Sequence, residues 1–244
     1  MTGYLRLQVL SALRDPRYIM LAIVAPIGFY LLFSALFGQE TGAGGIQTQT
    51  ALIVSMAVFG AMWAVLSATG PRIAQERSVG WLRQLRLLPV SAAAILTGRL
   101  LAALLIAGPA IVLVLLTGVI AHGVSLEAWR WLALLAVLWI GVVPVGALGM
   151  VVGYAADSEV AFGLVYGLYM VLAALGGLWM PMSILPSGLQ TIGKLLPSYR
   201  AADLGWRILA GRTIDFSSVL ILLAWTVVCA LLALAFSRRI ARSH

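Results

Sequence analysis

Residues 100–120 read LLAALLIAGPAIVLVLLTGVI, a run without a single charged side chain. The hydrocarbon core of a bilayer is about 30 Å thick, and about 20 apolar residues in a helix are needed to cross it. Lipid offers no partner for free backbone N–H and C=O groups, so a run of this kind crosses as a helix. This segment alone predicts an integral membrane protein.

The rest of the chain has the same character. It is 62% hydrophobic and only 10% charged, whereas about a quarter of the residues in soluble domains are charged. No internal repeat or low-complexity linker is evident, so residues 1–244 are treated as one transmembrane domain. We predict an all-α fold with six spans, at about 18–37, 51–69, 100–120, 131–154, 160–180 and 218–236.

The positions of the arginines predict the orientation. With the N-terminus inside, ten Lys and Arg fall on inner segments and five on outer segments, while Arg99 begins the third span. Because inner segments carry the excess of positive charge in membrane proteins, both termini are expected in the cytoplasm. The net charge of +8 is read as this topology signal, and not as a nucleic-acid surface.

Two inner segments are amphipathic. Residues 2–14 place Leu5, Val9 and Leu13 on one helical face, which predicts a helix lying on the inner membrane surface. Residues 71–91, PRIAQERSVGWLRQLRLLPVS, predict a second helix over 76–88. Two compatible interpretations of this second helix stay open: an arginine-rich anchor at the interface, or a helix that docks on a soluble partner.

One outer segment, residues 181–217, is too polar to cross the membrane and too apolar for a solvated loop. We expect it to return partway into the membrane as a re-entrant hairpin. Its helices should end before Pro197 and run over 199–210, with Ser198 as N-cap and Gly211 as terminator. Arg200, Asp203 and Arg207 have the spacing of i, i+3 and i, i+4 ion pairs.

Within this segment, residues 188–195 read GLQTIGKL and nearly match a phosphate-binding loop. That loop needs a Ser or Thr after the lysine to hold Mg²⁺, and it must follow a buried strand. Leu195 stands at the hydroxyl position, and flanking prolines exclude a core strand. We therefore expect this chain not to bind ATP itself.

The six predicted spans contain no Asp, Glu, Lys or Arg. Ion-coupled transporters commonly carry such groups within the membrane, so the energy for transport is expected from a partner. Motifs of intramembrane enzymes, such as HExxH and GxSxG, do not occur, and the single cysteine, Cys229, lies in the last span. Catalytic residues, metal sites and cofactors are therefore not expected in this chain.

Glycines four residues apart occur in two spans, as Gly149 with Gly153 and Gly163 with Gly167. This spacing allows helices to approach closely. It predicts a packed bundle without naming the helices that meet.

Together these features resemble the membrane subunit of ABC-2 type exporters. The resemblance is carried by LRDPRYIMLAIVAPIGFYLLF (13–33), by QERSVGWLRQLRLLPVS (75–91), by MPMSILPSGLQTIGKLLPSYRAADLGWRILAG (180–211) and by the spacing of the six spans. Together these features cover most of the chain. Ser78, Trp81 and Leu88 depart from the residues frequent in the family's inner loop.

The resemblance implies a permease in the bacterial cytoplasmic membrane that exports an amphipathic or lipid-like compound, such as a drug or antibiotic. Two permeases, identical or paralogous, would each rest on an ABC ATP-binding subunit that holds ATP and Mg²⁺. It further implies a coupling helix and an outer gate. For the coupling helix, the residues expected to dock are Glu76, Arg77, Trp81, Arg83 and Arg86; for the gate hairpin, the residues are Met180, Pro181, Pro186, Lys194, Pro197, Arg200 and Arg207.

Two rival functions are weighed against this one. A membrane resistance or immunity protein would bind a toxic lipid or peptide and need no nucleotide. A secondary transporter would depend on an ion gradient.

Overall fold

A computed structural model describes residues 16–38, 47–79 and 91–242. These residues form helices, and no strand occurs among them. In chain order the elements are α2 (Pro16–Ile19), η1 (Met20–Val24), α3 (Ala25–Phe37), α4 (Thr48–Ser78), α6 (Ala92–His122), α7 (Ala128–Gly141), α8 (Val143–Ala155), α9 (Ser158–Leu175), η2 (Met182–Ile184), α10 (Ser187–Leu195), α11 (Pro197–Leu209) and α12 (Phe216–Arg242). The expected surface helix at 2–14 lies outside the described residues.

Six helical segments in the described residues are long and apolar enough to cross a membrane, and they confirm the six predicted spans. The first span joins α2, η1 and α3 end to end. The fourth joins α7 and α8, which meet at Val142, where Pro144 begins the new helix without needing a partner for its missing N–H. The chain is thus an all-α, multi-pass membrane protein.

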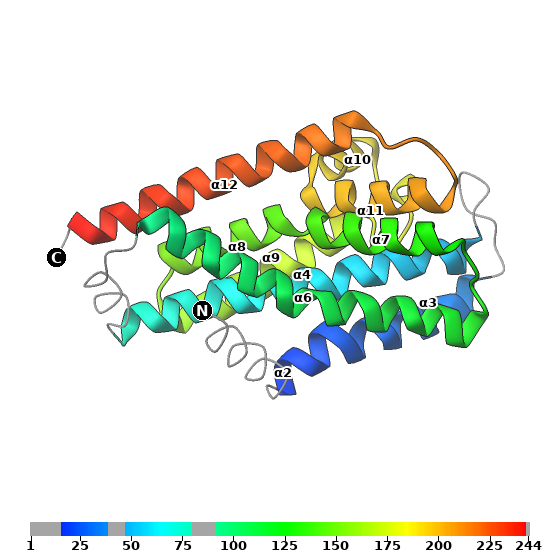
Figure 1. Cartoon of the computed structure of the whole chain (residues 1–244), viewed down its shortest axis with the longest axis horizontal. Coiled ribbons are helices and arrows are strands. Elements are labelled where there is room, and N and C mark those ends of the chain that lie inside the picture. The colour runs from blue at the N-terminus through cyan, green and yellow to red at the C-terminus, as the bar shows by residue number, and fades with distance from the viewer. Residues whose placement is uncertain (1–15, 39–46, 80–90, 243–244) are drawn as a thin grey trace.

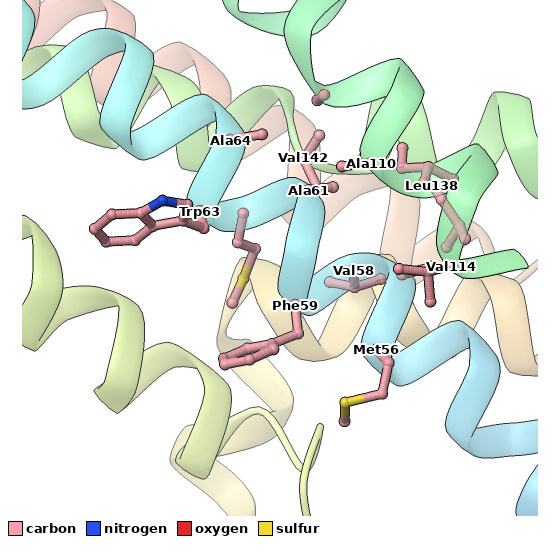
Figure 2. Close-up of a cluster of buried hydrophobic side chains, with 14 of the residues drawn as sticks. Met56, Val58, Phe59, Ala61, Trp63, Ala64, Ala110, Val114, Leu138 and Val142 are labelled. Carbon is pink, nitrogen blue, oxygen red and sulfur yellow. The ribbon is translucent and has the colours of Figure 1, made fainter. Parts of the chain in front are cut away.

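Helix α4 lies at the centre of the bundle (Figure 1). It packs against α3, α6, α8 and α9, and its side chains from Leu52 to Leu66 are buried. Figure 2 shows two sides of this helix: Val58 and Ala61 face Val114 and Val142, whereas Phe59 and Trp63 point the other way. A helix that is apolar on all sides is expected at the core of a bundle.

Small residues bring α8 against α4. A Cβ atom added at Gly153 would lie 2.6 Å from the Gly70 carbonyl oxygen, and one at Gly149 would lie 2.2 Å from Thr69 Oγ1. This confirms the close approach predicted from their spacing. Gly163 and Gly167 on α9 have no described atom within 4 Å of such a Cβ, so that pair does not serve packing within the described chain.

The two short helices predicted at the outer hairpin exist as α10 and α11. Helix α11 packs against α4, α7 and α12, at the end of the bundle away from the C-terminus (Figure 1). The sequence GLQTIGKL belongs to α10 and follows no strand. It lacks the strand-to-helix geometry of a phosphate-binding loop.

One predicted cap is confirmed and one is wrong. Gly211 ends α11 with φ +65°, and the next residue, Arg212, donates its N–H to the Arg207 carbonyl at 2.9 Å, which is the Schellman arrangement. Ser198 is not the N-cap, because α11 already begins at Pro197, a favoured first residue. The Ser198 hydroxyl instead donates to the Leu172 carbonyl at 2.7 Å.

Candidate functional site

The C-terminal end of α4 is tied to α6 by an ion pair. Glu76 accepts a hydrogen bond from Arg99 of α6 at 2.5 Å and lies 3.6 Å from Arg72, one turn earlier on α4. The Arg99 side chain is only 10% exposed. Glu76 therefore bridges two helices that flank residues 80–90 on the two sides.

Arg77 ties the same end of α4 to the turn between α8 and α9. Its Nη1 donates to the carbonyl oxygens of Gly153, Tyr154 and Ala156 at 3.1, 2.8 and 3.0 Å. These carbonyls belong to the last turn of α8, where no helical N–H remains to pair them. A positive charge there also faces the negative end of the helix dipole. Arg77 thus caps α8.

Two of the five residues predicted for docking, Glu76 and Arg77, are therefore held by contacts within the chain. Trp81, Arg83 and Arg86 lie outside the described residues. Sequence analysis missed the capping role of Arg77, because its partners are more than seventy positions away along the chain. The C-terminal end of α4 is thus part of a junction of α4, α6 and α8, and residues 80–90 follow α4 and precede α6 in the chain.

A second charged cluster joins α11 to the start of α12. Arg207 lies 3.0 Å from Asp203 and 3.5 Å from Asp215. Arg200 lies 3.7 Å from Asp215, instead of pairing with the Asp203 that the spacing predicted. Ser218 completes the cluster by donating to Asp203 at 2.9 Å and accepting from Arg200 at 3.2 Å. The two arginines of the hairpin are thus neutralised by carboxylates.

Asp215 also serves as the N-cap of α12. Its carboxylate accepts hydrogen bonds from the Ser217 hydroxyl and the Ser217 backbone N–H, the latter at 3.1 Å. These bonds, together with the charge of Arg207, hold the pKa of Asp215 below its ordinary value. An acidic residue immediately before an apolar helix is a cap signal that sequence reasoning could have used here.

The remaining residues predicted for the gate lie in α10, at the start of α11 and in the segments just before η2 and α10. Met180, Pro181, Pro186 and Lys194 are exposed, whereas Pro197 is buried at the start of α11. Pro181 and Pro186 directly precede η2 and α10. Their fixed φ and missing N–H explain why the segment breaks into short helices at these points. The structure brings Arg200 and Arg207 together through Asp215, and it leaves Lys194 on the surface of α10.

No candidate metal site is present in the part of the chain that the structure describes. No three His, Cys, Asp or Glu side chains there lie close enough to hold an ion. His122 accepts or donates a 3.1 Å hydrogen bond with the Tyr30 hydroxyl at the end of α6. This contact was also missed from the sequence, and it joins the first span to the third.

Six apolar helical segments, with α4 buried among the other five and charges gathered at the two ends, define a multi-pass membrane protein. Residues 4–208 match the ABC-2 type transporter family, and the chain belongs to it. The chain is also similar to "Putative transport permease YvfS" of Bacillus subtilis (strain 168), with 31% identity over 233 residues. That similarity covers 93% of this chain and 92% of the relative. A membrane transport permease is the class that these likenesses support.

Proposed function

We propose that this chain is the permease subunit of an ATP-driven exporter in the bacterial cytoplasmic membrane, with both termini in the cytoplasm. It acts as a single transmembrane domain and moves an amphipathic or lipid-like compound, drugs and antibiotics included. Two permeases assemble with two ABC ATP-binding subunits, and the path forms between the permeases. ATP and Mg²⁺ stay on the partner, and this chain carries no catalytic residue or cofactor.

The observation that carries the proposal is the junction at the inner end of α4. Residues 80–90 leave this junction from α4 and return to it at α6. Glu76 ties α4 to α6, and Arg77 ties α4 to α8. A push on this segment by a soluble subunit would therefore move three helices together. In this role Trp81, Arg83 and Arg86 contact the partner, while Glu76 and Arg77 transmit its movement.

The composition of the spans is consistent with transport that takes its energy from another chain. The six predicted spans carry no Asp, Glu, Lys or Arg that could bind a coupling ion. The lysine of GLQTIGKL, Lys194, lies on helix α10 instead of in a loop that could surround a phosphate. Both features favour ATP hydrolysis on another chain.

The outer hairpin is the proposed gate. It includes Met180, Pro181, Pro186, Lys194, Pro197, Arg200 and Arg207, and it re-enters the membrane from outside. Pairing of Arg200 and Arg207 with Asp203 and Asp215 lowers the cost of placing arginines near lipid. The same cluster links the hairpin to α12, so that movement of the last span and opening of the gate are coupled.

A charge-reversal experiment tests the docking. The tagged full-length chain is isolated from its native membranes in wild-type form and as Arg83→Glu with Arg86→Glu. We expect an ATP-binding subunit with the wild type and about tenfold less with the variant, a loss of about 1.4 kcal/mol in binding. Arg238→Glu with Arg239→Glu, which changes equal charge at the C-terminus, is the control and should retain the subunit. Equal recovery with all three chains would refute docking through residues 80–90.

A further inference from the structure

Aromatic side chains form one continuous stack between α4 and α9. Phe59 and Trp63 are one turn apart on α4, and the Tyr169 ring of α9 lies 4.5 Å and 5.3 Å from theirs. Phe162 and Tyr166 of α9 extend the stack, with their rings 5.9 Å and 6.1 Å from Trp63. Helical spacing puts these rings on facing sides of the two helices.

The stack continues from the middle of the bundle to the outer hairpin. Trp63 lies at the middle of α4, where Figure 2 shows it beside Phe59 and pointing away from the Val142 side. Phe59 in turn lies 5.5 Å from Trp179, which follows α9 and precedes η2. Phe29 of α3 closes the third side, 6.0 Å from Phe59 and 6.4 Å from Trp179.

Three hydrogen-bond donors in this stack are buried and have no partner among the described residues: Trp63 Nε1, the Tyr169 hydroxyl and Trp179 Nε1. Trp63 is 1% exposed and Tyr169 is 0% exposed. Buried donors are nearly always paired in proteins, because an unpaired one loses its bonds to water. Other indole groups of this chain follow that rule by donating to backbone carbonyls, namely those of Trp139, Trp206 and Trp225. Of the five unpaired buried side-chain donors in the described residues, three lie in this stack, and the other two are Nε atoms of Arg130 and Arg200.

We propose that the ring stack formed by Phe59, Trp63, Tyr169 and Trp179 is a binding site for the cargo. The ligand is an uncharged aromatic compound, whose oxygen atoms accept hydrogen bonds from the three free donors. Aromatic walls with a few placed polar groups are the usual lining of small-molecule sites, and offset or edge contacts between rings favour an aromatic ligand. The site rests on the proposed transport function and names the class of substrate for it.

The charge of the ligand follows from the surroundings. The predicted spans that supply Phe59, Trp63, Tyr169 and Trp179 hold no acidic or basic residue, so an ionised group would lose its hydration without gaining a partner. Access comes from the side of α9, where Phe162 is 38% exposed and Tyr166 is 40% exposed. A ligand that enters from the path between the permeases and parts α4 from α9 there would meet Trp63 first and Trp179 last.

Benzophenone is a suitable probe, because it is an uncharged aromatic ketone that forms covalent bonds with neighbouring C–H groups on irradiation. The full-length chain in lipid nanodiscs is irradiated with increasing benzophenone, and the labelled peptides are measured by mass spectrometry. We expect saturable labelling of peptides containing residues 59–63 and 162–169. The combined variant Trp63→Phe, Tyr169→Phe and Trp179→Phe leaves a phenyl ring at each position but removes the donors, and its labelling should fall about tenfold. Trp225→Phe, which removes a paired donor, should label like the wild type.

Two results would overturn this site. One is labelling that does not saturate, or that the combined variant leaves unchanged. The other is a lower melting temperature for the single variant Tyr169→Phe in ligand-free nanodiscs, because this change removes only the hydroxyl and the loss would mean that this donor already has a partner such as water. The experiment needs no ATP-binding subunit, so its failure is distinguishable from failure of the exporter assignment, which the isolation of partners tests.

Discussion

Replacing Arg77 with alanine removes the side chain that joins the C-terminal ends of α4 and α8. Its Nη1 has two hydrogens for three carbonyl oxygens at 2.8 to 3.1 Å, so two bonds form at a time. A hydrogen bond from a charged donor contributes about 1.5–3 kcal/mol. Because Arg77 is half-buried and water replaces part of each bond, we expect a loss of about 2–3 kcal/mol in the free energy of unfolding. For a chain of this size that corresponds to a fall of about 4–12 °C in melting temperature.

Thermal unfolding of the full-length chain in nanodiscs, followed by tryptophan fluorescence, measures this loss. Arg72→Ala is the matched control, because Arg72 makes only a 3.6 Å pair with Glu76 one turn away and is 34% exposed. Such a pair contributes about 0.3–0.5 kcal/mol. Arg77→Lys keeps the charge near the end of α8 and should fall between the two. Equal melting temperatures for the two alanine variants would refute the capping role of Arg77.

A methyl group at Gly153 would lie 2.6 Å from the Gly70 carbonyl oxygen, so Gly153→Ala should lower the free energy of unfolding by about 1–3 kcal/mol. Gly163→Ala is the control and should leave it unchanged, because its methyl group meets no described atom within 4 Å. Equal melting temperatures for the two variants would contradict the α4–α8 contact. Ser198→Ala removes the 2.7 Å hydrogen bond to the Leu172 carbonyl and should lower the free energy of unfolding by about 1 kcal/mol, and with it the melting temperature. Ser183→Ala, at an exposed position, should leave the melting temperature unchanged. Asp215 has a lowered pKa, so its stabilising effect is complete at neutral pH and is lost as the pH falls through that pKa. The difference in melting temperature between wild type and Asp215→Asn should therefore shrink as the pH falls below about 5, and a constant difference would show that the carboxylate charge does not matter.

The spans were predictable because they depend on local composition. About 20 consecutive apolar residues suffice to cross a bilayer whatever lies elsewhere in the chain. The break between α10 and α11 was also predictable, since Pro197 acts on its own backbone. The error at Ser198 has the same origin: proline at the first helical position moved the cap to Leu196 and turned the hydroxyl inward.

Contacts between distant segments could not be predicted in this way. The spacing of Arg200 and Asp203 suggested a pair, but Arg200 pairs at 3.7 Å with Asp215, which lies beyond the end of α11. The contact between Arg77 and the end of α8 could not be predicted, because no residue near Arg77 in the sequence indicates that α8 ends beside it. The unpaired donors of the ring stack likewise depend on burial, which only the packing of α4 against α9 decides.

The assignment as an ATP-driven permease is tested most directly by isolating the tagged, unmodified chain from its native membranes and quantifying every co-purifying protein by mass spectrometry. We expect a soluble ATP-binding subunit in near-equal amount, and the presence or absence of a second membrane subunit would distinguish a heterodimer from a homodimer of permeases. Recovery of the chain without any ATP-binding protein, under conditions that keep a known ABC-2 exporter intact, would contradict the assignment and favour a function that needs no nucleotide.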